Sequence, residues 1–236
     1  MLILRLVHTL IFYLIVGVSF FVGTAILLCF VPFAKQKNRP FLVAARIWSR
    51  FLIFFTGIKI KATGLENIPR DKPVIFAANH QAAADILLLA GFIPVHFRFA
   101  IKKELFKIPI FGWYLRKSHY LLIDREMILS AYKLVDAITE ILETGDSLLI
   151  FPEGTRTRTG ELGKFKRGSL LAALKTNVPV VPVAISGSYN IIPAGTWLMN
   201  YCPVKLSFGK PIEIKSEADY NAKVEEVRES IARMLK

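Results

Sequence analysis

A long uncharged stretch near the start of the chain limits the architectures open to this protein. From residue 9 to residue 34 the sequence has 26 consecutive uncharged residues, whereas a helix needs roughly 20 apolar residues to cross a bilayer. A secretory signal peptide is the alternative, because Arg5 precedes the stretch. Its apolar region normally extends over only about 7–15 residues and ends at a cleavage site with small residues. The length of the stretch therefore favours a helix that stays in the membrane.

Basic residues are concentrated beside this apolar stretch. The net charge is +13, from 31 Lys and Arg against 18 Asp and Glu, and the first acidic residue is Glu66. The first 60 residues contain seven basic residues and no acidic one, so they carry +7 of that charge. Basic charge beside apolar sequence favours an anionic bilayer surface over nucleic acid, because nucleic-acid-binding proteins spread basic residues over a polar face. The sequence therefore predicts a membrane protein with no nucleic-acid partner.

A second apolar stretch, residues 41–57, carries a polar stripe. Arg46, Ser49 and Arg50 are spaced three and four positions apart, which places them on one face of a helix. A basic stripe on an otherwise apolar helix is typical of an interfacial helix in the headgroup layer. The alternative is a core helix of the following domain. Residues 1–60 are thus predicted to form two membrane-anchoring helices at the cell membrane, whose basic residues face the cytoplasm.

The remainder of the chain, residues 61–236, alternates short β-branched runs with stretches of helical periodicity. The predicted strands cover residues 74–78, 97–101, 120–124, 147–151, 179–185 and 205–208. The predicted helices cover residues 82–91, 127–144, 168–176 and 217–235. Strands that are apolar throughout indicate burial on both faces, and hence an α/β domain with a mostly parallel central sheet and flanking helices. In such sheets ligands bind beyond the carboxyl ends of the strands.

The first chemical motif follows the first predicted strand of this domain. His80 comes directly after that strand, and Asp85 lies five residues further on. A histidine with a carboxylate beside it is a candidate general base whose partner orients the ring. Two residues five apart within one helix are rotated by about 140° and do not face each other. If His80 instead precedes the helix and Asp85 lies in its first turns, the carboxylate can fold back to the imidazole. The motif's place between strand and helix favours this arrangement.

The same spacing recurs at His119 and Asp124 and provides an internal control. This second pair lies in a predicted strand, where residues five apart point to opposite faces and sit roughly 16 Å apart. We therefore expect no contact between them. His8 lies in the predicted anchor and His96 has no acidic residue near it in the sequence, so both are interpreted as structural. His80 is left as the candidate base.

The second motif lies where the strand 147–151 ends, at Glu153, Gly154, Thr155 and Arg156. It combines a carboxylate, a flexible backbone and a guanidinium group that can grip a phosphate with two parallel hydrogen bonds. Further basic residues follow at Arg158, Lys164, Lys166 and Arg167. A nucleotide-binding P-loop is excluded, because the Gly-Lys pair of this segment is followed by Phe and not by Ser or Thr. A solvated basic loop is the alternative.

No candidate nucleophile or metal site accompanies these motifs. Ser169 and Ser186 lack the Gly-x-Ser-x-Gly turn of hydrolases. The two cysteines, Cys29 and Cys202, lie in no motif, exclude a disulfide scaffold and provide no zinc-ligand spacing. A base without a nucleophile predicts direct attack by a hydroxyl group of the substrate.

Four ordered blocks of the sequence resemble a known family. The blocks are Asn79-His80-x4-Asp85; Lys102-x-Glu104-Leu105 with Pro109, Gly112 and Ile123-Asp124-Arg125; Phe151-Pro-Glu-Gly-Thr-Arg156; and Val181-Pro-Val-Ala-Ile185. They resemble the blocks of the glycerolipid acyltransferases, and in particular of the bacterial 1-acyl-sn-glycerol-3-phosphate acyltransferases.

The resemblance implies transfer of a fatty acyl group from acyl-CoA or acyl-carrier protein to the sn-2 hydroxyl of lysophosphatidate, with no cofactor. His80 would be the general base, and Asp85 would hold its tautomer and stabilise the imidazolium. Glu153, Gly154, Thr155 and Arg156 are implied to position the acceptor. Arg156 and Arg125 are implied to bind its phosphate. Lys102 and Lys166 are implied to contact the phosphate or the acyl donor. Three alternatives stay open: an acyltransferase with another acceptor (glycerol 3-phosphate or a lysophospholipid), a hydrolase, and a peripheral lipid-binding protein.

Overall fold

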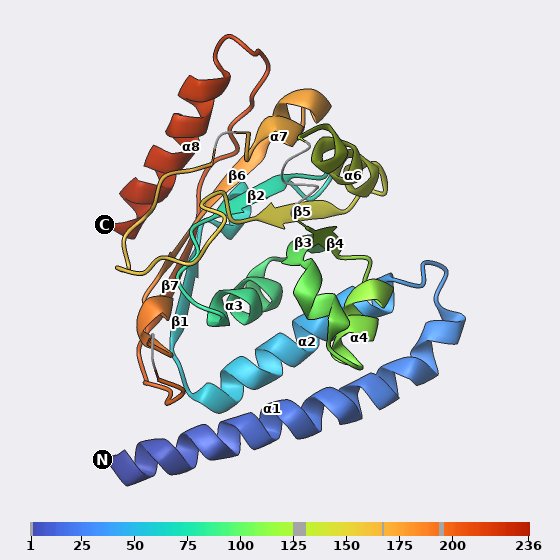
Figure 1. The fold of residues 1–236 in the computed structure, drawn as a ribbon, viewed down its shortest axis with the longest axis vertical. Coiled ribbons are helices and arrows are strands. Elements are labelled where there is room, and N and C mark those ends of the chain that lie inside the picture. Colours follow the sequence, from blue (N-terminus) through green and yellow to red (C-terminus); the bar gives the residue numbers. More distant parts are fainter. Residues whose placement is uncertain (1, 125–130, 167, 194–195) are drawn as a thin grey trace.

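A mixed β-sheet forms the centre of the protein. The computed structural model describes residues 2–124, 131–166, 168–193 and 196–236, and in this part seven strands follow the order β1-β7-β6-β2-β5-β3-β4 (Figure 1). The strands are β1 Ile60–Thr63, β2 Ile75–Ala78, β3 Phe97–Lys102, β4 Leu121–Ile123, β5 Ser147–Ile150, β6 Val180–Ser186 and β7 Val204–Phe208. Neighbouring strands are parallel except β6 and β7, which are antiparallel. The predicted mostly parallel sheet is confirmed.

Six of these strands overlap the predicted ones, and β1 has no predicted counterpart. β1 is a four-residue edge strand, partly exposed along its length, and lysines at positions 59 and 61 interrupt its apolar character. Its pairing with β7, which aligns Ile60 with Val204, comes from a distant part of the chain. A local pattern of apolar residues therefore contains no signal for it.

Helices cover both faces of the sheet. The α-helices are α1 Leu2–Phe30, α2 Arg39–Thr56, α3 Ala84–Phe92, α4 Phe111–Lys117, α6 Ala131–Glu143, α7 Leu171–Thr176 and α8 Tyr220–Leu235. The 3₁₀ helices are η1 Val31–Phe33, η2 Leu65–Asn67, η3 Lys103–Lys107 and η4 Ser188–Asn190.

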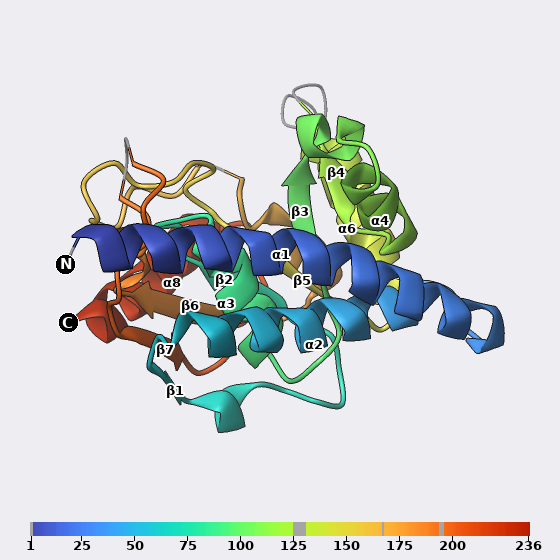
Figure 2. The same cartoon turned by 90° about the horizontal axis from the view of Figure 1, so that it is seen from below.

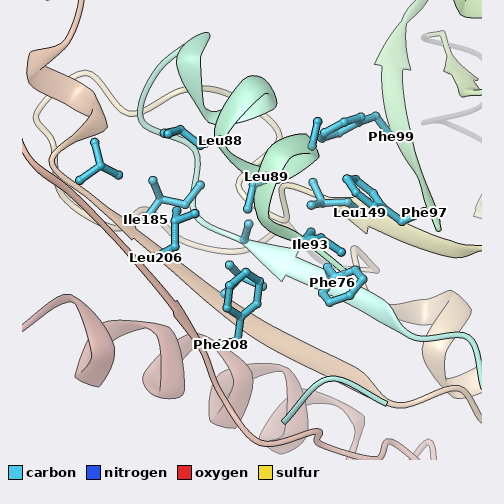
Figure 3. Close-up of a cluster of buried hydrophobic side chains, with 14 of the residues drawn as sticks. Phe76, Leu88, Leu89, Ile93, Phe97, Phe99, Leu149, Ile185, Leu206 and Phe208 are labelled. Carbon is cyan, nitrogen blue, oxygen red and sulfur yellow. The ribbon is translucent and has the colours of Figure 1, made fainter. Parts of the chain in front are cut away.

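Successive residues of β2 point to opposite faces of the sheet, and both faces are buried. Phe76 belongs to a cluster with Leu89 of α3 (Figure 3), whereas Ile75 belongs to a second cluster with Ile141 of α6 and Val227 of α8. This double burial explains why the strand is apolar throughout.

Helices α1 and α2 form an antiparallel pair along one side of the molecule (Figures 1 and 2). α1, together with η1, is long and apolar enough to cross a membrane, and most of its large side chains are exposed. Polar contacts fix it to the rest of the protein. Arg5 donates to the backbone carbonyls of Met199 (2.8 Å) and Leu198 (3.0 Å), and the Trp48 indole of α2 donates to the Ser19 hydroxyl (2.9 Å). The predicted apolar N-terminal helix is confirmed.

The polar stripe of α2 faces the protein and not the lipid headgroups, so the interfacial orientation expected from the sequence is wrong. Arg50 donates to the Gly91 carbonyl (2.8 Å), Arg46 donates to the Val95 carbonyl, and Ser49 is buried. The Gly91 carbonyl lies at the end of α3, where helices present carbonyls without intrahelical partners and a partial negative charge, and the Val95 carbonyl lies in the loop that follows. The exposed face of α2 is apolar instead, with Val43, Ile47, Phe51, Phe54 and Phe55.

The beginning of α2 is tied to the sheet by a buried charge cluster. Asp146, directly before β5, is fully buried and contacts Arg39 of α2 (2.9 Å) and Arg98 of β3 (2.8 Å). Together with the core position of Leu52, these contacts support the alternative that α2 is a core helix of the domain that follows it. The division into an anchor of residues 1–60 and a domain of residues 61–236 stays a prediction.

Candidate active site

Two parallel neighbours in the sheet, β2 and β5, bring the two chemical motifs to one edge. Ala77 of β2 is aligned with Ile150 of β5, so the residues that follow both strands emerge side by side. Asn79, directly after β2, binds β6, which is the other neighbour of β2 in the sheet. Its side-chain amide donates to the Ile185 carbonyl (2.9 Å) and its side-chain oxygen accepts from the Ile185 N–H (2.7 Å). These two buried hydrogen bonds hold the end of β2 against β6.

His80 precedes α3, and Asp85 lies in the first turn of that helix. The His80 Nδ1 and Asp85 Oδ2 atoms are 2.8 Å apart, so the contact expected from the spacing is present. Asp85 is fully buried, and the His80 side chain is 17% exposed. If Nδ1–H donates to the carboxylate, Nε2 is left unprotonated and can accept a proton.

The same oxygen of Asp85 also organises the loop before the helix. Oδ2 accepts hydrogen bonds from the N–H groups of Gln81 (2.7 Å) and Ala82 (2.9 Å) in addition to the imidazole. Within the described part of the chain, the buried Oδ1 atom has no hydrogen-bond partner. One carboxylate oxygen therefore fixes both the loop and the ring.

An aromatic ring from the neighbouring strand end holds the plane of the imidazole. The Phe151 and His80 rings are stacked, with centroids 3.9 Å apart and an interplanar angle of 14°. Sequence reasoning did not assign this role to Phe151, although the residue begins the motif that contains Glu153. The signal was its position, because a residue at the end of β5 must lie beside the residue at the end of β2.

Glu153 binds the protein backbone with both carboxylate oxygens. Oε1 accepts from the His80 N–H (2.9 Å) and Oε2 accepts from the Gly163 N–H (2.8 Å), and the residue is buried. The sequence predicted that Glu153 positions the acceptor. The observed hydrogen bonds favour a different role, in which Glu153 positions His80 and the loop that carries Gly163.

Replacing Glu153 with Gln tests this role. The amide can accept only one of the two backbone hydrogen bonds and turns an N–H donor toward the other, which disturbs His80. We expect kcat to fall roughly 5–100-fold, with little change in the KM for the acceptor, because a buried unpaired donor costs about 1–3 kcal/mol and this donor displaces His80. Steady-state kinetics of both substrates check this. A rise in the acceptor KM with unchanged kcat would restore the substrate-binding role.

The loop after Glu153 places basic side chains beside the dyad. The Thr157 N–H donates to the His80 carbonyl (2.9 Å), which holds the exposed Arg156 next to the candidate base. Gly154 has a φ of 73°, and a Cβ atom there would collide with the side chain of Lys166. Glycine is thus required for this turn and for the close approach of Lys166. The structure therefore brings the backbone after Arg156 to the His80 carbonyl and the Lys166 side chain to Gly154.

The two remaining predicted ligands are Lys102 and Arg125. Lys102 is the last residue of β3, which borders β5, and its side chain is exposed at the same edge of the sheet. Arg125 lies outside the described residues. Their roles stay predictions.

A side-chain network that sequence reasoning missed fastens the basic loop to the site. The Gln81 amide donates to the Gly160 carbonyl (3.2 Å) and its oxygen accepts from the Ser188 hydroxyl (3.1 Å). The Tyr189 hydroxyl donates to the Arg158 carbonyl (2.9 Å). The one signal for this network in the sequence is the position of Gln81 between the candidate base and its carboxylate. Its partners come from segments far away in the chain.

The second His–Asp pair is not built like the first. β4 covers only three residues between His119 and Asp124, so neither residue lies in the strand as predicted. Asp124 contacts Lys103 (3.2 Å), and His119 has a φ of 54° and an exposed side chain.

Burial, together with the guanidinium groups nearby, lowers the pKa of His96, so this side chain is neutral at pH 7.

An α/β sheet with an oriented imidazole at its carboxyl edge is the architecture of an enzyme, and the long apolar helix beside it indicates association with a membrane. A family model described as Acyltransferase matches residues 59–186. The chain therefore belongs to the acyltransferase family, and the family resemblance noted in the sequence is confirmed.

Named relatives agree with this assignment. The chain is 36% identical to a 1-acyl-sn-glycerol-3-phosphate acyltransferase of Pseudomonas aeruginosa, over 75% of this chain and 70% of the relative. It is 35% identical to a chloroplast 1-acyl-sn-glycerol-3-phosphate acyltransferase of Arabidopsis thaliana, over 84% of this chain but only 54% of the relative. The crystal structure of the 1-acyl-sn-glycerophosphate acyltransferase PlsC from Thermotoga maritima superimposes with a TM-score of 0.84 at 30% identity, covering 99% of this chain and 96% of that one.

Proposed function

We propose that this protein transfers a fatty acyl group from an acyl thioester, either acyl-CoA or acyl-carrier protein, to the sn-2 hydroxyl of lysophosphatidate. The product is phosphatidate. The observation that carries the proposal is the 2.8 Å contact between His80 and the buried Asp85 at the sheet edge. The names of the relatives support this choice of acceptor.

In the proposed reaction, His80 Nε2 removes the proton of the sn-2 hydroxyl while the oxygen attacks the thioester carbonyl carbon. The new C–O bond gives a tetrahedral intermediate, which collapses with cleavage of the C–S bond. The imidazolium then returns its proton to the sulfur, so that the thiol leaves. Asp85 stays ionised and stabilises the imidazolium, as the carboxylate of a Ser-His-Asp triad does. The enzyme needs no nucleophile of its own.

The membrane is a partner in this proposal, because the acceptor resides in the bilayer. The exposed apolar surfaces of α1 and α2 support an anchor there. Between the two helices Lys35 remains available for anionic headgroups, whereas Lys37 donates to the Val31 and Pro32 carbonyls. Arg39, Arg46 and Arg50 also bind the protein. By the positive-inside rule this turn and the catalytic part face the cytoplasm.

One assay tests the reaction itself. The purified full-length chain in detergent micelles is offered lysophosphatidate with acyl-CoA or with acyl-carrier protein, and the products are resolved by mass spectrometry. We expect phosphatidate with the new acyl chain at sn-2. Acylation of glycerol 3-phosphate or of a lysophospholipid in its place would assign another acceptor. Release of free fatty acid alone would indicate a hydrolase, and the absence of turnover would favour a lipid-binding protein.

Replacing Arg156 with Ala should raise the KM for lysophosphatidate by roughly 10–100-fold, because a hydrogen bond to a charged group contributes about 1.5–3 kcal/mol. The KM for the thioester should change little. Arg156→Lys should rescue only part of the loss, since an ammonium group lacks the planar fork of a guanidinium. Arg158→Ala, in the same exposed loop, is the matched control. A change in the thioester KM alone would place Arg156 at the donor site.

A further inference from the structure

Exposed large hydrophobic side chains are gathered on a few segments of this protein. Among the described residues they lie on α1 with η1, on α2, at residues 105–110, and at Trp197 and Tyr201. The first two segments form the helical pair already described. Residues 105–110, which we call the apolar turn, belong to the catalytic part and comprise the last residues of η3 and the link to α4. Soluble monomeric proteins rarely expose apolar side chains gathered in this way.

The apolar turn holds its side chains outward in a strained conformation. Leu105, Ile108 and Ile110 are 41%, 45% and 46% exposed. Ile110 has φ 60° and ψ −54°, and the Phe111 N–H donates across it to the Pro109 carbonyl (2.6 Å). This is a tight γ-turn of the rare, strained kind, which a β-branched residue seldom adopts. Such strain is typical of functional segments.

The apolar turn is continuous with the anchor. Phe111, directly after it, contacts Phe20 of α1 with ring centroids 5.9 Å apart, and Tyr114 of α4 contacts the same ring at 5.9 Å. The buried Tyr114 hydroxyl donates to the Phe41 carbonyl of α2 (2.6 Å). Phe111 and α4 consequently lie against α1. Their position is fixed relative to the helix that enters the bilayer.

The charges around the apolar turn are those of a surface that meets anionic lipid. Residues 102–117 contain five basic side chains and one acidic side chain, Glu104. The basic residues are Lys102, Lys103, Lys107, Arg116 and Lys117. Lys103 contacts Asp124 and Arg116 donates to the Phe106 carbonyl, whereas Lys102, Lys107 and Lys117 are exposed. Exposed apolar side chains accompanied by basic ones are the pattern of an interfacial contact with a bilayer.

We propose that the apolar turn is a second membrane contact, which inserts Leu105, Ile108 and Ile110 into the headgroup region of an anionic bilayer. Lys102, at the end of β3, immediately precedes η3, so this contact holds the catalytic edge of the sheet at the membrane surface. The membrane contact is inferred from the exposed apolar side chains and the basic side chains near them. Its consequence for catalysis rests on the proposed transfer to a bilayer-resident acceptor.

Site-specific labelling of the full-length chain tests the contact. In a Cys29→Ser/Cys202→Ser background, Ile108→Cys is labelled with an environment-sensitive dye and mixed with vesicles of phosphatidylglycerol and phosphatidylethanolamine. Ala222→Cys, an exposed position on α8, is the matched control. We expect a blue shift and quenching by nitroxide-labelled lipids at position 108 and neither at position 222. Equal water exposure at both positions would overturn the proposal, as would protection at 108 by acidic acyl-carrier protein but not by vesicles.

A functional readout separates this proposal from the acyltransferase assignment. Ile108→Asp should lower activity on long-chain lysophosphatidate in anionic vesicles roughly tenfold, because a charged side chain opposes insertion. Its activity on a short-chain soluble analogue should stay at the wild-type level, as should the activity of Ala222→Asp on both substrates. Unchanged vesicle activity of Ile108→Asp would contradict the catalytic consequence. Absence of transfer by the wild-type protein would instead contradict the proposed function and leave the dye experiment valid.

Discussion

Replacing His80 with Ala is expected to lower kcat by about 10²–10⁴, the usual contribution of a general base. The reason is that His80 is held by Asp85 at 2.8 Å and by the stacked ring of Phe151, at the edge where the two motifs meet. The measurement is initial rates of phosphatidate formation at saturating lysophosphatidate and thioester. Thermal unfolding in detergent should stay close to the wild type, because the ring is partly exposed and its loss leaves the backbone hydrogen bonds intact.

His119→Ala is the matched control for this experiment. His119 has the same spacing to an aspartate, but that aspartate, Asp124, follows the other end of β4 and contacts Lys103. We expect the His119 variant to keep most of its activity. Equal losses in the two variants would contradict the assignment of His80 as the base.

Replacing Asp85 with Ala should cost nearly as much activity as the loss of His80 and should also destabilise the fold. The carboxylate orients the ring, and it accepts hydrogen bonds from the N–H groups of Gln81 and Ala82. Leaving buried donors unpaired costs about 1–3 kcal/mol, which a shift in unfolding temperature will report. Because His80 and Asp85 act as a unit, the double variant should be no slower than the single His80 variant. An additive double variant would show that the two act independently.

Asp85→Asn separates orientation from charge. One oxygen of Asp85 makes all three hydrogen bonds, so the Asn side-chain oxygen can accept them with the same geometry. The variant should therefore retain the loop but lose the negative charge that stabilises the imidazolium. We expect a kcat between those of the wild type and Asp85→Ala. Wild-type activity of Asp85→Asn would show that the charge of Asp85 does not contribute to the reaction.

Much of the site could be read from local sequence. The contact between His80 and Asp85 was predicted because a strand end followed by a helix start places two such residues face to face. The Glu153 motif was predicted to follow a strand end, where ligands bind in parallel sheets. Both arguments use only backbone geometry and the order of the elements, which follow from the periodicity of the sequence. Only the pairing of β2 with β5 places the Glu153 motif beside His80.

The partners of individual polar groups could not be read in this way. Glu153 was predicted to bind the acceptor, and its oxygens instead accept backbone N–H groups of His80 and Gly163. The Gln81 network to Gly160 and Ser188 had no local signal. In each case the partner comes from a segment that the fold brings in from elsewhere, and a pattern along one segment contains no information about it.

The two N-terminal helices show the same division most clearly. The sequence by itself determined that α1 is a membrane-length apolar helix and that Arg46, Ser49 and Arg50 share one face of α2, because both follow from composition and helical period. Only the tertiary structure decided where that face points. It points toward α3, because Arg50 donates to the Gly91 carbonyl at the end of that helix and Arg46 donates to the Val95 carbonyl in the loop that follows. The apolar face of α2 is consequently left exposed, because the polar face of the same helix is used for hydrogen bonds with the protein.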